Sequence, residues 1–91
     1  MEQESRTVFF SGAVQGVGFR WTARDLAAGF AVTGYVRNLP DGRVELFAEG
    51  SPAEIDRFLA ALRSAMRSYI RGENAERGPA TGRFGSFSIR F

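Results

Sequence analysis

The sequence predicts a single α+β domain in which two helices pack on one face of a mostly antiparallel sheet. The chain has 91 residues, 44% of them hydrophobic and 24% charged, which suits one folded core. Its apolar residues alternate in some segments and recur at helical spacing in others, in the order β-α-β-β-α-β with one further strand at the end. We therefore treat residues 1–91 as one domain and expect residues 1–6 to be disordered.

Residue type and turn signals assign each element in chain order. The strands are β-branched or aromatic, or alternate apolar with polar residues, whereas the helices repeat apolar residues every three or four positions. The first expected elements are a strand over Thr7 to Gly12, a helix that begins at Phe19 and ends near Gly29, and a hairpin of Val32 to Leu39 and Arg43 to Glu49 around the turn Pro40-Asp41-Gly42. They are followed by a second helix from Pro52, a weaker strand over Ser68 to Glu76, a loop over Arg77 to Arg83 and a last strand over Phe84 to Phe91.

The second helix has the clearest signature in the chain. Ser51 is expected as its N-cap, Pro52 as its first residue, and Glu54 as the residue that completes a capping box. Its core face is expected to consist of Ile55, Phe58, Leu59, Leu62 and Met66. Two helices on one face of a sheet with this element order make a ferredoxin-like sandwich. Because that fold serves many functions, the function has to be argued from the site.

The composition excludes several kinds of chemistry. The chain contains no cysteine and no histidine, which excludes disulfides, Cys nucleophiles, Ser-His-Asp triads and metal sites built from thiolates or imidazoles. All twelve basic residues are arginine, and ten carboxylates spread along the chain leave a net charge of +2 without a basic block. We therefore expect no nucleic-acid partner. No apolar run approaches the roughly 18 residues of a membrane span, so we expect a cytoplasmic protein with no membrane contact.

The loop before the first helix reads Gly12-Ala13-Val14-Gln15-Gly16-Val17-Gly18-Phe19-Arg20. Its glycines allow successive backbone N–H groups to converge on one anion, and the helix N-terminus adds unpaired N–H groups. Arg20 can add a bidentate guanidinium. The loop is thus suited to bind phosphate, sulfate or carboxylate. Taken alone, its glycines fit equally well with a tight strand-to-helix connection that binds nothing. Its glycine spacing is wrong for a dinucleotide loop, and no Lys-Ser/Thr follows as in a P-loop.

A second polar segment, Tyr35 to Gly42, ends the second strand and makes the hairpin turn. The first two strands are expected to run in the same direction, so their ends lie at the same edge of the sheet and Asn38 lies toward Arg20. An amide can donate one hydrogen bond while it accepts another from water, as a group that orients a water nucleophile must. The alternative for Asn38 is a turn-capping side chain.

Together, the two segments resemble the acylphosphatase family. The loop from Gly12 to Arg20 is similar to that family's active-site signature, and Gly34-Tyr35-Val36-Arg37-Asn38-Leu39-Pro40-Asp41-Gly42-Arg43-Val44-Glu45 is similar to its second motif. The resemblance extends from about Thr7 to Phe91. Two departures are Ala13, where a basic or polar residue is usual, and the region Ser68 to Arg83, which matches poorly because Gly72 and Asn74 make it less apolar.

The resemblance implies hydrolysis of the carboxyl-phosphate bond of acylphosphates to carboxylate and inorganic phosphate, without metal or cofactor. It makes Arg20 and Asn38 the catalytic residues, with Arg20 on the phosphate and Asn38 on the attacking water. The phosphate-binding residues are then Gln15, Gly16, Val17, Gly18, Phe19 and Arg20. Because an acylphosphate has a good carboxylate leaving group, a site without His or Cys can suffice. We expect a monomer whose partners are the small-molecule substrate and the phosphate product.

Two other functions are alternatives to acylphosphate hydrolysis. A non-catalytic ferredoxin-like binding module would use exposed aromatic residues on the open sheet face, for which Phe9, Tyr35 and Phe47 are candidates. The third strand is acidic at alternate positions, which argues against RNA. A closer alternative is a relative that hydrolyses carbamoyl phosphate. The carboxylates that could be proposed as bases are expected to have solvated structural roles instead; they are Asp25, Asp41, Glu45 and Glu49.

The end of the chain is also expected near the site. If the last strand lies along the free edge of the second strand and runs parallel to it, the α-carboxylate of Phe91 comes close to Arg20. A carboxylate at that distance would orient the guanidinium and offset its charge. The alternative is a frayed terminus in water.

Overall fold

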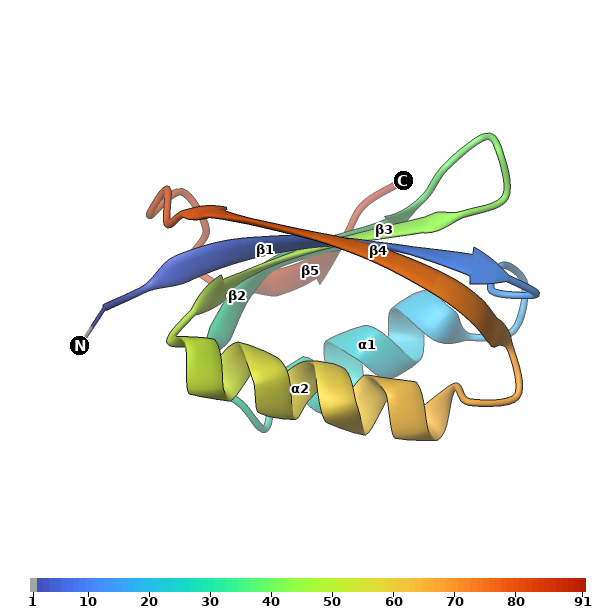
Figure 1. The fold of residues 1–91 in the computed structure, drawn as a ribbon, viewed down its shortest axis with the longest axis horizontal. Helices are drawn as coiled ribbons and strands as arrows, with labels where there is room; N and C mark the ends of the chain where they lie inside the picture. The colour runs from blue at the N-terminus through green and yellow to red at the C-terminus, as the bar shows by residue number, and fades with distance from the viewer. Residues whose placement is uncertain (1) are drawn as a thin grey trace.

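The computed structural model describes residues 2–91 and has the two-layer architecture expected from the sequence (Figure 1). The elements are β1 (Glu4–Gly12), α1 (Phe19–Ala27), β2 (Val32–Asn38), β3 (Val44–Gly50), α2 (Pro52–Ala65), β4 (Ile70–Pro79) and β5 (Phe87–Ile89). Both helices lie on the same side of the sheet, side by side beneath it in the view of Figure 1. The ferredoxin-like fold with an additional C-terminal strand is therefore confirmed.

The order of the strands across the sheet is β4-β1-β3-β2-β5. β1 and β2 both pair antiparallel with the central strand β3, so they run in the same direction and end at the same edge of the sheet. β5 pairs in parallel with the free edge of β2, with Tyr35 opposite Ser88. This arrangement brings three segments to one edge: the loop after β1, the end of β2 and the end of the chain.

The N-terminal strand begins earlier than the sequence predicts. Residues 4–6, which were expected to be disordered, are part of β1: Glu4 pairs with Gly50 on one side and with Pro79 on the other. The same pairing extends β4 to Pro79, past the expected end at Glu76. Residue type alone missed this extension because backbone pairing between neighbouring strands, rather than apolar side chains, determines it. The last strand is shorter than expected, since only Phe87–Ile89 pairs with β2.

The core between the sheet and the helices matches the expected face of α2. Ile55, Phe58, Leu59, Leu62 and Met66 are all buried. Ser51 caps α2 as expected, because its Oγ accepts a hydrogen bond of 3.3 Å from the Glu54 backbone N–H. The Glu54 carboxylate does not complete the capping box. It accepts the Ala31 N–H at 2.9 Å instead, which ties the end of the α1–β2 connection to the start of α2.

Residues 80–86, here called the covering loop, lie over part of the other face of the sheet. Phe84 of this loop packs on Tyr35 and Phe47, which stack on each other with centroids 5.6 Å apart. Two carboxylates of β3 that were expected to be solvated are buried on this face, with Glu45 8% and Glu49 4% exposed, and the covering loop bonds to Glu49. A non-catalytic binding module would expose Phe9, Tyr35 and Phe47. Here Phe84 packs over Tyr35 and Phe47.

Candidate active site

Arg20 and Asn38 line the same small cavity, at the sheet edge where β1 and β2 end. The cavity measures about 70 Å³, which gives room for a tetrahedral oxyanion group. Its lining residues are Val14, Gly16, Gly18, Phe19, Arg20, Trp21 and Asn38. The topology thus brings together two residues that are 18 positions apart in the chain, as the parallel direction of β1 and β2 predicts.

The loop that forms this cavity alternates anchors with glycines. Val14 and Phe19 are buried, and the Phe19 ring packs on Phe10 with centroids 5.1 Å apart. Between these anchors, Gly16 and Gly18 adopt φ values of 75° and 79°, a left-handed conformation that residues with a side chain rarely take. Gly18 is also the N-cap of α1, and it provides no side-chain cap. Val14 and Phe19 therefore fix the loop to the core, while the backbone at Gly16 and Gly18 faces the cavity.

The backbone N–H groups of this loop are available for a ligand. Among residues 2–91, no protein group accepts a hydrogen bond from the N–H groups of residues 15–20, and the first N–H of α1 that is paired within the protein is that of Thr22. Unpaired N–H groups at a helix start, together with the positive end of the helix dipole, favour an anion. Residues 15–20 together with Asn38 are therefore the candidate oxyanion cradle, and are called the cradle from here on.

Arg20 supplies the charge of the cradle. No ion pair within the described chain includes Arg20, so its in-plane N–H donors are not used by a carboxylate. The guanidinium instead lies over the ring of Phe91, with Cζ 4.9 Å from the ring centroid. A ring on the flat face of a guanidinium orients it and leaves its in-plane edge free for phosphate oxygens.

This contact corrects one expectation about the chain end. β5 does run parallel to β2 and does bring Phe91 to Arg20. However, the group that contacts Arg20 is the aromatic ring, and no ion pair between Arg20 and the α-carboxylate exists among the described residues. The sequence predicts the position of the terminus from strand topology, whereas the side-chain torsions of the last residue decide which of its groups faces the guanidinium.

Asn38 contributes an unpaired acceptor. Its Oδ1 is buried and has no hydrogen-bond partner within residues 2–91. A buried amide oxygen without a partner carries a free-energy cost of about 1–3 kcal/mol, so such a group normally receives a donor from water or ligand. The turn-capping role considered for Asn38 is not seen, because this oxygen caps nothing in the described chain.

Gln15 has a supporting position rather than a place in the cavity wall. Its Nε2 donates to the backbone oxygens of Leu39 at 2.8 Å and Arg43 at 3.0 Å. The side chain thus fastens the cradle loop to both sides of the β2–β3 turn, next to Asn38. Val17 does not line the cavity either and packs against the core instead. The N–H groups of both residues still belong to the cradle.

The turn beyond Asn38 holds a carboxylate that is committed to structure. Asp41 accepts the Arg43 backbone N–H at 3.1 Å and the Arg43 Nε at 2.8 Å. These two hydrogen bonds lower the pKa of Asp41 below its ordinary value, so it stays ionised and paired near neutral pH. Asp41 is therefore unsuited to act as a general base.

Trp21, which was not predicted as a site residue, lines the cavity from the first turn of α1. It is 57% exposed although it is the single tryptophan of the chain. Its position next to Arg20 at the start of a helix was the signal available in the sequence. An isolated aromatic residue there does not reveal whether it faces the core or the cavity.

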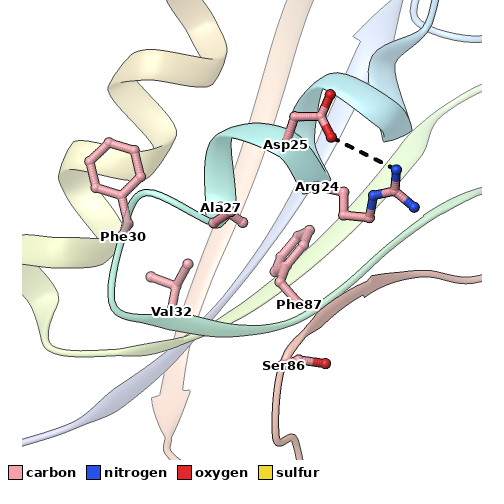
Figure 2. A pocket seen from close by; sticks show the side chains of 8 residues that line it. Arg24, Asp25, Ala27, Phe30, Val32, Ser86 and Phe87 are labelled. Carbon is pink, nitrogen blue, oxygen red and sulfur yellow. Dashed lines mark ion pairs between the residues drawn. The ribbon is translucent and has the colours of Figure 1, made fainter.

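A larger hollow lies elsewhere in the described chain. It measures about 620 Å³ and lies beside the C-terminal half of α1, against β5 and the residue before it. Figure 2 shows that its wall is mostly apolar, with Ala27, Phe30, Val32 and Phe87, and that its one charged pair, Arg24 and Asp25, is joined by an ion pair of 3.8 Å. Arg20 and Asn38 line the smaller cavity instead, where unpaired polar groups converge.

Neither helix of the described chain combines the length and hydropathy that a membrane crossing requires. No group of three or more carboxylate, imidazole or thiol side chains within residues 2–91 is arranged to hold a metal ion.

Comparison with known proteins identifies the family. The acylphosphatase family model matches residues 6–89. The chain is 40% identical over 91 residues to an acylphosphatase of Acidothermus cellulolyticus, covering 96% of this chain and 87% of that protein. It superposes on the crystal structure of Bacillus subtilis acylphosphatase with a TM-score of 0.88 at 29% identity, covering 97% of this chain and 99% of that one. It also matches 12% of the length of HypF from T. kodakarensis, with a TM-score of 0.82 at 27% identity and 97% of this chain covered. On the family model, the sequence identity and the fold, the chain belongs to the acylphosphatase family.

Proposed function

We propose that this protein hydrolyses the carboxyl-phosphate bond of acylphosphates by direct attack of a water molecule on a phosphoryl group held in the oxyanion cradle. Membership of the acylphosphatase family supports the reaction. The unpaired N–H groups of residues 15–20 and the free in-plane edge of Arg20 support the position of the phosphoryl group.

Charge in phosphoryl transfer spreads over the three oxygens that do not react. The cradle offers two kinds of donor for them: backbone N–H groups fixed by the anchored loop, and the guanidinium of Arg20. Because the Phe91 ring and the core anchors hold these donors before substrate arrives, little reorganisation is needed during the reaction.

The observation that carries the proposal is the buried, unpaired Oδ1 of Asn38 in the same cavity as Arg20. A water molecule that donates a hydrogen to this oxygen satisfies it and directs a lone pair toward the phosphorus. Gln15 fixes the turn that follows Asn38, so the amide is held in place from both sides of the hairpin. Asn38 thereby contributes orientation rather than proton abstraction.

The bonds balance without a further group. The water oxygen forms a bond to phosphorus while the bond from phosphorus to the acyl oxygen breaks. The electron pair of that bond leaves on the carboxylate, and the water proton passes to a phosphate oxygen or to solvent. A stable carboxylate is a good leaving group, so general acid catalysis is not required.

The test is an assay of the purified protein on benzoyl phosphate in the presence of a chelator, with phosphate release as the readout. We expect turnover well above the spontaneous rate. Activity should be lost in Arg20→Gln, which changes the cavity. Activity should be kept in the matched control Arg67→Gln, which changes an exposed arginine just after the end of α2. Carbamoyl phosphate is assayed in parallel, and turnover of that compound alone would favour the carbamoyl-phosphate relative. Phosphate binding without turnover of either compound would favour a non-catalytic module.

A monomeric state and a cytoplasmic location stay predictions. Sedimentation equilibrium tests the first, and fractionation of the cells that make the protein tests the second.

A further inference from the structure

The cradle has an aromatic rim whose exposure the fold does not explain. Trp21 lines the cavity and is 57% exposed, and Phe91 lies on Arg20 and is fully exposed. Tryptophan and phenylalanine side chains carry large apolar surfaces that favour burial. Here the Phe91 ring lies against the guanidinium of Arg20, and Trp21 lines the same cavity, which is the proposed phosphoryl site.

Trp21 is held in place on the outside of α1. The guanidinium of Arg24, one turn further along the helix, lies over the indole ring with Cζ 4.1 Å from the centroid. Such a contact fixes the ring orientation by an attraction of about 0.5–1 kcal/mol at an exposed site. Arg24 therefore limits the motion of Trp21, while more than half of the Trp21 surface remains accessible.

The size of the cavity decides where the rest of a substrate must lie. At about 70 Å³, it has room for a phosphoryl group and not for an acyl group as well. The acyl group must therefore project past the rim, where Trp21 is part of the cavity lining and Phe91 lies against Arg20. A flat apolar acyl group in that position would cover aromatic surface that is otherwise in contact with water.

We propose that Trp21, supported by Arg24 and accompanied by Phe91, forms the acyl-binding platform of this enzyme and selects acylphosphates with an aromatic or similarly flat apolar acyl group. The inference rests on the proposed function and specifies its substrate class. Trp21 contacts the acyl group of the substrate, whereas Arg24 is a positioning residue that acts through Trp21.

The kinetic test compares benzoyl phosphate with acetyl phosphate, because the two differ only in the acyl group. In Trp21→Ala, the ratio of kcat/KM for benzoyl phosphate to that for acetyl phosphate is expected to fall by about five- to tenfold, the value of one aromatic stacking contact. Trp21→Phe keeps a flat ring and is expected to recover most of the ratio. Tyr69→Ala, which removes another exposed aromatic side chain outside the cavity, is the matched control and should leave the ratio unchanged.

A binding measurement tests the contact between Trp21 and the acyl group without turnover. Trp21 is the single tryptophan, so the intrinsic emission of the protein reports on this position alone. Benzoylphosphonate, a non-hydrolysable analogue, is expected to quench that emission on binding, and inorganic phosphate is expected to change it much less. Arg24→Gln should weaken the quenching by benzoylphosphonate while inhibition by inorganic phosphate stays as in the parent protein.

The outcomes separate this inference from the proposed function. A parent protein that hydrolyses both acylphosphates, with an unchanged ratio in Trp21→Ala, overturns the acyl platform and leaves the hydrolase intact. Equal quenching by phosphate and benzoylphosphonate also overturns it. A parent protein that hydrolyses neither compound overturns the proposed function, and the platform with it.

Discussion

The cradle and the covered face of the sheet both gather polar groups, but they differ in whether those groups are paired. Under the covering loop, Glu49 accepts the N–H groups of Thr81 at 2.6 Å and Gly82 at 3.1 Å. Glu45, four residues earlier on β3, accepts the Tyr35 hydroxyl at 2.6 Å and Arg37 Nε at 2.8 Å. In the cradle, the N–H groups of residues 15–20 and Asn38 Oδ1 have no protein partner within the described chain.

This difference separates structure from function. Buried polar groups that satisfy each other stabilise the fold, because removing one partner leaves the other unpaired. Polar groups that converge on a cavity without partners are held there by the rest of the structure and are completed by a ligand. Substitutions in the cradle should therefore reduce activity with little effect on stability, and substitutions under the covering loop should do the reverse.

The largest effect is expected for Arg20→Gln. Loss of one preorganised charged donor should lower kcat/KM for benzoyl phosphate by about 10²–10³-fold. Inhibition by inorganic phosphate should weaken as well, because the proposed mechanism has the guanidinium bind the phosphate in both the ground state and the transition state. The free energy of unfolding, measured by urea denaturation, should stay within about 0.5 kcal/mol of the parent value, since Arg20 makes no ion pair in residues 2–91. A loss of cooperative unfolding would make Arg20 a structural residue.

Asn38→Ala should separate turnover from phosphate affinity. Its proposed partner is the attacking water, so kcat should fall by about 10²-fold while the inhibition constant of inorganic phosphate changes little. Stability should not decrease, because the substitution removes an unpaired buried acceptor. Equal losses in turnover and phosphate affinity would mean that Asn38 binds phosphate directly.

Glu49→Gln tests the covered face. Replacement of a charged acceptor by a neutral one should lower the free energy of unfolding by about 1–3 kcal/mol and leave kcat/KM within about twofold. Glu76→Gln, which alters an exposed carboxylate on β4, is the control and should change stability by less than about 0.5 kcal/mol. A large loss of activity in Glu49→Gln would contradict the expectation that substitutions under the covering loop affect stability and not activity.

The same carboxylate predicts a pH dependence. Burial of Glu49 disfavours its charged form, but the hydrogen bonds from Thr81 and Gly82 outweigh burial and lower the pKa below the ordinary value of 4.5. A lowered folded-state pKa contributes stability that is complete above 4.5 and is lost as the pH falls below it toward the folded-state value. Urea midpoints between pH 7 and pH 3 should therefore fall more steeply for the parent protein than for Glu49→Gln. Parallel curves would contradict this assignment.

The smallest effect concerns the end of the chain and distinguishes its ring from its carboxylate. Phe91→Ala should raise the inhibition constant of inorganic phosphate by about two- to fivefold, because Arg20 loses the ring that orients it. Addition of one serine after Phe91 moves the carboxylate away but keeps the ring, and should leave that constant unchanged. The opposite pattern would restore the carboxylate as the partner of Arg20.

Most of the fold could be predicted from the sequence because its signals are local. The cap and apolar face of α2, the hairpin turn and the glycine loop each depend on residues close together in the chain. The extension of β1 to Glu4 and of β4 to Pro79 could not, because those strand ends are polar and are held by pairing with each other. The burial of Glu49 could not be predicted for a similar reason, since the loop residues that bond to it come more than 30 residues later. Glu45 is buried by its pairing with Tyr35 and Arg37 of the neighbouring strand, which also depends on the assembled sheet.

By itself, the sequence determined the family, the strand-loop-helix unit that carries Arg20, and the direction of β2 that brings Asn38 to it. Only the tertiary structure decided how the side chains at that edge are used. Gln15 turns to the hairpin instead of the cavity, Trp21 joins the cavity wall, and the ring of Phe91 rather than its carboxylate meets Arg20. The physical reason is that backbone direction follows from local patterns and strand pairing, whereas the orientation of a surface side chain depends on neighbours that only the assembled fold supplies.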